Sequence, residues 1–311
     1  MIEIFKTLDD GLKRMTDYDA GCWVALTNPS PTELLEVSDK YSIDIDHLKA
    51  PLDEEERSRI ETEDNYTLVL VDIPCVEEKD NKERYVTMPL GIIIAENVLI
   101  TVCLEATPIL KGFMDGRVRE FYTYKKTRFI LQILYKNASV YLQDLKIIDR
   151  KSEEIEDKLH ISQKNRELIE LLELEKSLVY FTTSLRANEV VLEKLLKSDS
   201  IKQYPEDTEL LEDVIIENKQ AMEMANIYSG ILSGMMDAFA SVISNNLNIV
   251  MKTLATITIV MSIPTMVFSL YGMNFKNIPL GGWEHGFAAV TAGTLVLTAI
   301  IAVLFAKKDL F

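Results

Sequence analysis

Two long uncharged stretches near the C-terminal end constrain the fold more than any other feature of this sequence. Residues 253–275 form 23 consecutive positions without a charged side chain, and residues 287–306 form another 20. Each reaches the roughly 20 residues with which a helix crosses about 30 Å of hydrocarbon. Pro279, Gly281 and Gly282 in the intervening residues 276–286 predict a tight turn between two antiparallel spans. Two buried core helices are the alternative, but a soluble core rarely needs two such stretches side by side.

The basic residues beside these spans predict how the chain crosses the membrane. Lys252 precedes the first span, and Lys307 and Lys308 follow the second. Because basic residues stay on the cytoplasmic side, we expect a multi-pass protein of the cell (inner) membrane with both termini in the cytoplasm and the turn outside. Two spans cannot enclose a water-filled path alone, so a conducting role requires an oligomer.

Charge and composition exclude several classes of function. The chain carries 33 Lys and Arg against 49 Asp and Glu, a formal net charge of −16. Such a chain does not suit nucleic-acid phosphates and attracts cations instead. The sequence contains no GxxxxGK[ST] loop, which argues against nucleotide-driven pumping. The three cysteines and three histidines are scattered, and no nucleophile–base motif is visible, so we expect neither a zinc cluster nor an enzyme.

Residues 1–116 have the pattern of a cytoplasmic α/β domain. Residues 23–26 form a short apolar run, followed by a turn and a helix start at Thr32. Residues 66–73 are rich in β-branched and aromatic side chains, which predicts a strand that stops at Pro74. Residues 90–95 and 98–102 flank Glu96 and Asn97 and predict a hairpin.

Residues 117–251 have the composition of a long helical stalk. Residues 117–198 contain neither Pro nor Gly, and Pro205 stands where a new helix begins. Apolar residues then recur every three or four positions into the first span, which predicts one helix over about 206–271, roughly 100 Å long at about 1.5 Å per residue. The two spans complete the chain as a pore domain over residues 252–311.

Hydroxyl groups follow one face of the first span. Thr258, Ser262, Thr265 and Ser269 have the spacing i, i+4, i+7 and i+11, and Asn248 and Met251 extend this face. Two interpretations remain open: the hydroxyls bond backbone carbonyls and neighbouring helices, or they line a pore. Neither span contains a carboxylate, so a ring of acids within the membrane is not available.

The sequence Tyr271-Gly272-Met273-Asn274-Phe275 ends this span and resembles the signature of the CorA family of divalent-cation channels. The resemblance extends over essentially the whole chain, through Trp23, Pro31-Thr32, residues 52–57 and residues 66–74. It implies an α+β membrane protein whose helical stalk continues into the first of two C-terminal transmembrane helices. It also implies a homopentamer surrounded by membrane lipid, with Mg²⁺ as the transported and regulatory ion.

The resemblance implies a selectivity filter at Gly272, Met273 and Asn274. Mg²⁺ releases water reluctantly, and a ring of Asn274 carbonyls could hydrogen-bond the hydrated ion while Gly272 permits the backbone turn. Gap-free matching to the family adds Leu254 to the pore-lining positions, although the spacing alone leaves Leu254 or Ala255 undecided. The complete implied pore lining is Asn248, Met251, Leu254, Thr258, Ser262, Thr265 and Ser269, with Met251 and Leu254 as a hypothetical gate.

The resemblance also implies regulation by cytosolic Mg²⁺ bound between subunits. The matched stalk residue is Asp213, and its partner acid would lie among Glu77, Glu78 and Asp80. Bound cations would hold the acidic assembly closed by relieving repulsion between its subunits. Each of these acids could instead be an ordinary solvated carboxylate.

The outer turn departs from the family pattern. Many members carry acids after the signature and Met-Pro-Glu in the turn, whereas here Lys276 follows Phe275 and Glu284 is the only acid of the turn. A transporter of Zn²⁺ or Co²⁺, proton-coupled or exporting, is therefore an alternative, as is a membrane-anchored cation sensor that does not conduct.

Overall fold

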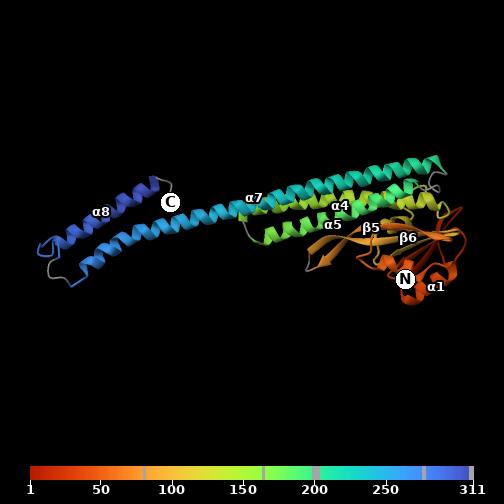
Figure 1. Cartoon of the computed structure of the whole chain (residues 1–311), viewed down its shortest axis with the longest axis horizontal. Helices are drawn as coiled ribbons and strands as arrows, with labels where there is room; N and C mark the ends of the chain where they lie inside the picture. Colours follow the sequence, from red (N-terminus) through yellow and green to blue (C-terminus); the bar gives the residue numbers. More distant parts are fainter. Residues whose placement is uncertain (80–81, 163–164, 198–203, 275–277, 308–311) are drawn as a thin grey trace. The chain divides into compact units, whose positions relative to one another are not determined.

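The computed structural model describes residues 1–79, 82–162, 165–197, 204–274 and 278–307 (Figure 1). The chain divides into two compact units, Met1–Gly234 and Met235–Phe311, and the boundary falls inside helix α7 (Pro205–Tyr271). The expected boundaries at 116/117 and 251/252 follow composition and remain predictions. Each unit is described below by itself.

One seven-stranded mixed sheet forms the framework of the first unit. Its order is β2-β1-β3-β7-β6-β5-β4. The β3–β7 pair is parallel, whereas the remaining neighbours are antiparallel. The strands are β1 (Ile2–Leu8), β2 (Gly11–Met15), β3 (Cys22–Thr27), β4 (Arg59–Thr62), β5 (Tyr66–Lys79), β6 (Lys82–Ala95) and β7 (Val98–Cys103). The hairpin expected at Glu96-Asn97 is confirmed by β6 and β7.

Both faces of this sheet are covered. One core joins apolar side chains of the central strands to α3 (Pro108–Met114), α4 (Lys126–Ser162), α5 (Asn165–Lys197) and the first turns of α7. The other core lies under α1 (Pro31–Tyr41), α2 (Ile45–Lys49) and the 3₁₀ turn η1 (Ala50–Leu52). The start of α1 has a sequence cause, since Ser30 and Glu33 form a reciprocal capping box and Pro31 occupies the first turn.

Strand β5 is longer than the sequence predicts, because it continues through Pro74 to Lys79. Strand β4 pairs with β5 only as far as Leu70, so the following residues have β6 as their one neighbouring strand. Asp72 directs its backbone N–H and C=O away from β6, toward side chains of α4 and α5. Pro74, two residues later, faces the same way, so its missing N–H removes no bond from the ladder.

The helical part begins later than its composition predicts. Helix α4 starts at Lys126 rather than near Arg117. Thr123 explains the difference, because its backbone N–H donates to the Thr7 hydroxyl at 3.1 Å and its own hydroxyl accepts from the Thr7 N–H at 3.1 Å. This reciprocal pair holds the segment before α4 against β1 in a non-helical conformation.

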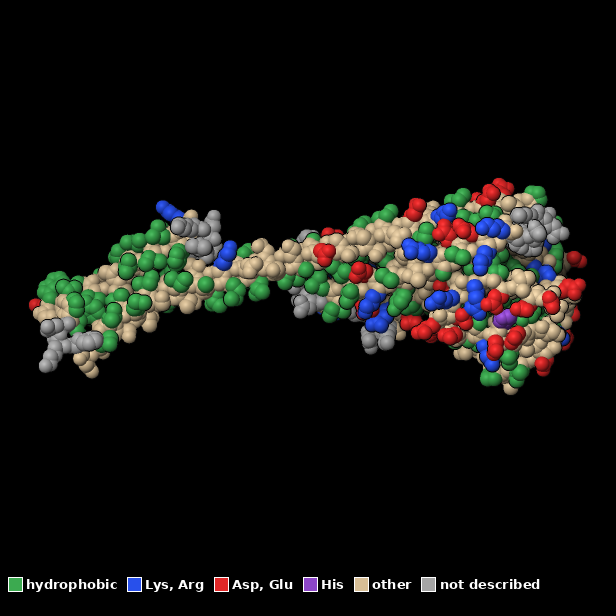
Figure 2. Space-filling model, in the orientation of Figure 1, with side chains coloured by type: hydrophobic (Ala, Val, Ile, Leu, Met, Phe, Trp, Pro, Cys, Tyr) green, Lys and Arg blue, Asp and Glu red, His purple; other side chains and the backbone are tan. Residues whose placement is uncertain are grey.

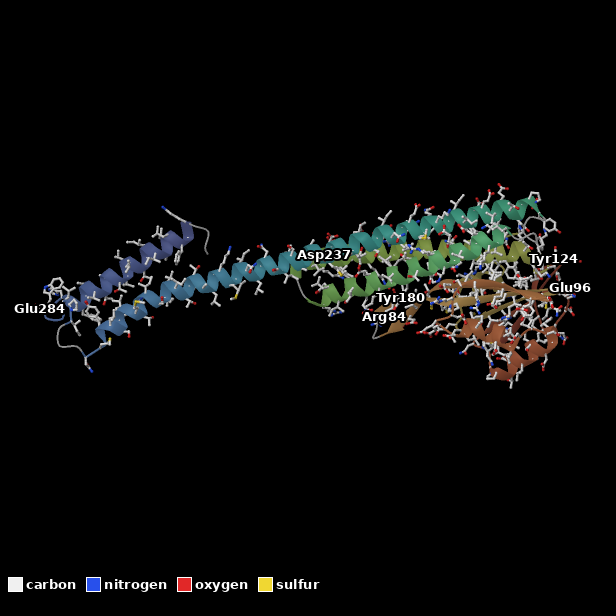
Figure 3. All side chains as sticks on the ribbon, viewed as in Figure 1. Arg84, Glu96, Tyr124, Tyr180, Asp237 and Glu284 are labelled. Atoms are coloured by element: carbon white, nitrogen blue, oxygen red, sulfur yellow. The ribbon has the colours of Figure 1, made fainter. Side chains whose placement is uncertain are left out.

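Among the described residues, two helices are long and apolar enough to cross a membrane, α7 and α8 (Gly286–Lys307), with mean hydropathies of 1.8 and 2.3 in their most apolar windows. Helix α7 contains 67 residues, matches the expected 206–271 closely and passes through Pro264 without ending. Between Asp237, labelled in Figure 3, and Tyr271 its only charged residue is Lys252. Figure 2 shows that charged side chains gather on the first unit, whereas the side chains of α8 are mainly hydrophobic.

Candidate functional site

The hydroxyl face predicted for the first span is present in the structure as a groove along α7. Thr258, Ser262, Thr265 and Ser269 all line it, and all four are exposed. Apolar side chains alternate with the hydroxyls along the same groove, namely Ile257, Met261 and Met266. The sequence spacing therefore identified a row of hydroxyl groups on one face of the largely apolar part of α7 that follows Lys252.

Three of the four hydroxyl groups donate hydrogen bonds to carbonyls of their own helix. Thr258 donates to the Leu254 carbonyl at 2.8 Å, Ser262 to the Ile259 carbonyl at 2.7 Å and Thr265 to the Met261 carbonyl at 3.0 Å. A hydroxyl whose proton is used in this way still has acceptor lone pairs. The groove thus presents hydrogen-bond acceptors without negative charge, which suits water molecules and the waters around a cation.

The other expected pore residues on α7 are also exposed in the single chain. Asn248 is exposed, Met251 is 56% exposed and Leu254 is 57% exposed. Ala255 is exposed as well, so exposure does not decide between positions 254 and 255. Their role as a lining or gate remains a prediction.

The expected filter residues lie immediately after α7. The helix ends at Tyr271, and the Gly272 N–H still donates to the Phe268 and Ser269 carbonyls at 2.9 and 3.2 Å. Met273 donates to the Leu270 carbonyl at 3.3 Å, and Asn274 follows as exposed, irregular chain. The motif is therefore a turn in which Gly272, Met273 and Asn274 are all exposed.

The conformational role expected for Gly272 is not supported. Its φ is not positive, and a Cβ at this position would meet the Phe268 and Ser269 carbonyl oxygens at 3.4 and 3.5 Å, which is ordinary contact. A single chain would therefore accept a larger residue at position 272. Among the described residues, nothing near position 272 requires a glycine.

The structure does not assemble the expected regulatory acids into one site. Asp213 is exposed on α7, and Glu77 and Glu78 are exposed on β5. Asp80 lies outside the described residues. Within the described part of the chain, no three His, Cys, Asp or Glu side chains are placed to hold a metal ion. The described residues of one chain therefore do not complete a metal site around Asp213.

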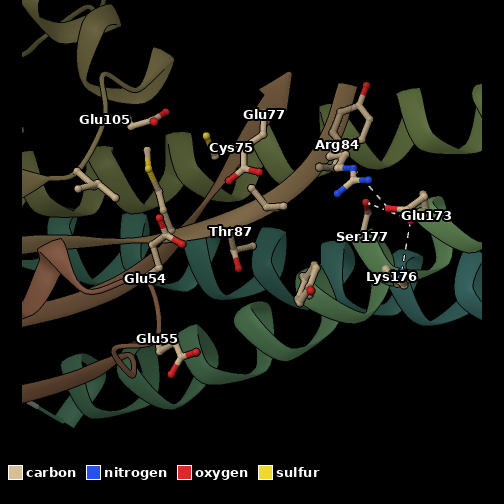
Figure 4. Close-up of a pocket in the computed structure, with 15 residues that line it drawn as sticks. Glu54, Glu55, Cys75, Glu77, Arg84, Thr87, Glu105, Glu173, Lys176 and Ser177 are labelled. Carbon is tan, nitrogen blue, oxygen red and sulfur yellow. Dashed lines mark hydrogen bonds and ion pairs between the residues drawn. The ribbon is translucent and has the colours of Figure 1, made fainter. Parts of the chain in front are cut away.

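Glu77 instead lines an acidic cleft of about 450 Å³ between the β5–β6 hairpin and α5 (Figure 4). Sequence reasoning missed this cleft, because its acids come from segments far apart in the chain: Glu54, Glu55, Glu105 and Glu173. Glu173 is paired with Arg84 at 3.5 Å and with Lys176 at 3.4 Å.

The cleft also contains the Cys75 thiol. Burial, together with Glu105 and Glu77, raises the pKa of this thiol, which keeps it protonated and makes it a poor metal ligand.

Comparison with known proteins agrees with this arrangement of α/β unit, long helix and two apolar helices. The family model described as "CorA-like Mg2+ transporter protein" matches residues 18–308. A cobalt/magnesium transport protein of Methanocaldococcus jannaschii is 31% identical over 296 residues, covering 92% of this chain and 90% of that protein. A second, from Thermotoga maritima, is 25% identical over 324 residues, covering 98% of this chain and 88% of that protein.

Solved structures give the same result for the fold. The complete structure of the magnesium transporter CorA from M. jannaschii superposes with a TM-score of 0.85 and 26% identity, covering 99% of this chain and 98% of the other. The matches thus extend across both units and include the residues that follow α7. The family consists of transporters rather than enzymes, in agreement with the composition and the scattered cysteines and histidines. The chain is a member of the CorA-like Mg²⁺ transporter family.

Proposed function

We propose that this protein is a homopentameric channel of the cell (inner) membrane that carries divalent cations, with Mg²⁺ as its principal substrate. The observation that carries the proposal is the uncharged groove of α7, which leads in sequence directly to Gly272-Met273-Asn274. Membership in the family supports it, as does the name of the M. jannaschii relative, a cobalt/magnesium transport protein. Co²⁺ is accordingly the second ion that we expect to pass.

The chemistry of the groove favours a hydrated ion. Mg²⁺ binds water tightly and usually keeps several waters when a protein binds it. The hydroxyl oxygens of Thr258, Ser262 and Thr265 can accept hydrogen bonds from those waters, because their own protons are already given to α7 carbonyls. Neutral oxygens hold the ion weakly enough for it to leave, as conduction requires.

Asn274 is the proposed selectivity residue. One amide carbonyl from each subunit would form a ring that contacts the waters of the ion, with the backbone oxygens of Gly272 and Met273 beside it. A single chain cannot surround an ion with one exposed asparagine, so this role depends on the oligomer. With both termini in the cytoplasm, the membrane potential would drive entry by about 2.3 kcal/mol per charge per 100 mV, or about twice that for a divalent ion.

Asp213 is the proposed regulatory residue. Its carboxylate is exposed, and the described residues place no other acid with it in a metal-binding group. Glu77 and Glu78 are exposed too, and they could supply the second ligand from a neighbouring subunit. Mg²⁺ bound between subunits would hold the acidic assembly closed.

Ion flux into liposomes that contain the purified full-length protein tests the function. We expect Mg²⁺ and Co²⁺ to enter when a negative internal potential is applied, and Asn274→Ala to abolish entry while the oligomer keeps its size. Zn²⁺ flux that follows a pH gradient, with no response to voltage, would replace the proposal with a coupled transporter. Absence of all flux after removal of internal Mg²⁺ would leave a cation sensor that does not conduct.

A further inference from the structure

Among the described residues, one side chain of α7 forms a hydrogen bond to the outer turn between α7 and α8. The Tyr271 phenol, on the last residue of α7, donates a hydrogen bond to the Pro279 carbonyl at 3.0 Å. This bond joins two positions on either side of Gly272-Met273-Asn274. The described part of unit Met235–Phe311 contains no other tyrosine, and residues 272–274 have no phenol of their own.

The start of α8 also lies close to this turn. A Cβ on Gly286 would lie 2.2 Å from the Leu280 carbonyl oxygen, so only glycine permits this close approach. The peptide units of Pro279 and Leu280 are thus contacted by the last residue of α7 and by the first residue of α8. Backbone bonds complete the turn, from Gly281 to the Ile278 carbonyl at 3.0 Å and from Trp283 to the Leu280 carbonyl at 3.2 Å.

Leu280 holds an unfavourable backbone conformation within this turn. Its φ is +63°, in the left-handed region that branched side chains rarely occupy. Such a conformation persists only where the surrounding contacts fix it, and it is found most often at functional sites. Among the described residues, the Trp283 N–H holds the Leu280 carbonyl, Gly286 lies close to the same carbonyl, and Tyr271 holds the preceding Pro279.

We propose that Tyr271 is a positioning residue for ion selection, which acts by fixing the outer turn through Pro279. This inference rests on the proposed function. The Asn274 side chain makes no hydrogen bond to the described residues, so its place depends on the chain at either end of the motif. Helix α7 fixes the chain before the motif, and the bond from Tyr271 restrains Pro279, which follows the motif in the sequence. A ring that recognises the waters of an ion needs its oxygens placed to within about 0.5 Å.

Tyr271→Phe tests the role, because it removes the hydroxyl and keeps the ring. In liposomes we expect the Mg²⁺ concentration at half-maximal flux to rise about fivefold, the effect of losing one hydrogen bond. The preference for Mg²⁺ over Co²⁺ should fall as well. Tyr124→Phe is the control, since Tyr124 is 55% exposed and lies in the other unit. It should leave both quantities unchanged.

A merely structural role gives a different result. If Tyr271→Phe lowers the amount of intact oligomer and the maximal flux but keeps the half-saturating Mg²⁺ concentration and the Mg²⁺ to Co²⁺ ratio, the positioning role is wrong. Unchanged flux in every respect would contradict it too. After either of these two results for Tyr271→Phe, the proposed function would still hold if the wild-type protein conducts and Asn274→Ala does not. Wild-type protein without flux would overturn the proposed function and this inference together.

A double-mutant cycle with Leu280→Gly gives a second, independent measurement. Glycine adopts the left-handed conformation without a side-chain penalty, so the turn then depends less on its contact with Tyr271. We expect the loss of Mg²⁺ affinity caused by Tyr271→Phe to be smaller in the Leu280→Gly background. An equal loss in both backgrounds would show that the phenol does not act through this turn.

Discussion

Asn188 of α5 satisfies the backbone of β5 at the point where that strand loses its second neighbour. Its Nδ2 donates to the Asp72 carbonyl at 2.7 Å, and its Oδ1 accepts from the Asp72 N–H at 2.8 Å. Asn137 Nδ2 and the Tyr141 phenol, both on α4, donate to the same carbonyl at 2.9 and 3.2 Å. Three buried side chains thus replace a missing strand and connect two helices to the sheet.

We expect Asn188→Ala to lower the free energy of unfolding of the first unit by about 2 kcal/mol, because the Asp72 N–H is left without a partner in a buried place. Asn188 is only 2% exposed, so water cannot replace the amide easily. Asn226→Ala, at an exposed position of α7, is the matched control. Chemical denaturation of the detergent-solubilised protein would measure both changes, and equal stabilities would disprove the assignment.

Asp144 of α4 is a buried carboxylate whose charge is unfavourable. Burial raises its pKa to about 6 from the ordinary value of 3.8. The folded protein therefore binds a proton more tightly than the unfolded chain does. The stabilisation from protonated Asp144 is complete below about pH 4 and is lost as the pH rises through about 6.

Asp144→Asn should therefore raise the thermal stability at pH 7.5, by the equivalent of about 1–3 kcal/mol, because the ionised form is no longer buried. At pH 4 the carboxyl of the folded wild-type protein is almost fully protonated, so the difference should become small. Glu153→Gln, at an exposed position of α4, is the control for loss of one negative charge. Thermal unfolding at both pH values decides the matter, and a pH-independent difference would contradict this explanation.

The packing of η1 against β6 requires a residue without a side chain at Gly91. A Cβ there would lie 2.2 Å from Cγ of Pro51, so the 3₁₀ turn η1 rests directly on the strand backbone. We expect Gly91→Ala to displace η1 and to lower stability by about 1–3 kcal/mol, as overpacking does. Gly112→Ala in α3 has open space around the added methyl and should be neutral or slightly stabilising. Denaturation of the two variants in parallel measures the contrast, and equal effects would contradict it.

The elements that sequence predicts best are those with long periodicity. Helix α7 was predicted over 206–271 and begins and ends within one residue of those limits, because apolar spacing and Pro205 mark it unambiguously. The hairpin at Glu96-Asn97 was equally clear. The continuation of β5 through Pro74 and the late start of α4 were not predictable, since both depend on partners distant in the chain: Asn188 for the strand, and Thr7 for the segment before the helix.

In the candidate site too, features that depend on local spacing could be predicted, whereas features that depend on distant partners could not. The spacing of Thr258, Ser262, Thr265 and Ser269 is a local property of one helix, so the face that they share could be predicted. The contact between Tyr271 and Pro279, and the left-handed Leu280, depend on how the outer turn closes, for which the sequence offers no periodicity. The acidic cleft escaped prediction for a similar reason, because its acids come from loops, strands and a helix that only the fold brings together.

At the scale of the whole molecule, the single chain leaves its candidate functional groups incomplete. The groove of α7 opens on one side, Asn274 is a single amide, and Asp213 is an exposed carboxylate outside any metal-binding group of described residues. Symmetric assembly would repeat each of them around one axis. It would also bring several chains of net charge −16 together, which gives divalent cations a general stabilising effect.

A specific regulatory site and this general effect of charge make different predictions for Asp213. If Mg²⁺ binds Asp213 between subunits, Asp213→Asn removes a charged ligand, and the internal Mg²⁺ concentration that closes the channel should rise about tenfold. Glu212→Gln removes the same charge from the neighbouring exposed position, and it should have little effect. Flux into liposomes with graded internal Mg²⁺ compares the two variants. Equal shifts would mean that only the total charge matters, because general repulsion does not distinguish adjacent acids. A shift for Asp213→Asn alone would identify this carboxylate as a ligand through which the ion holds the subunits together.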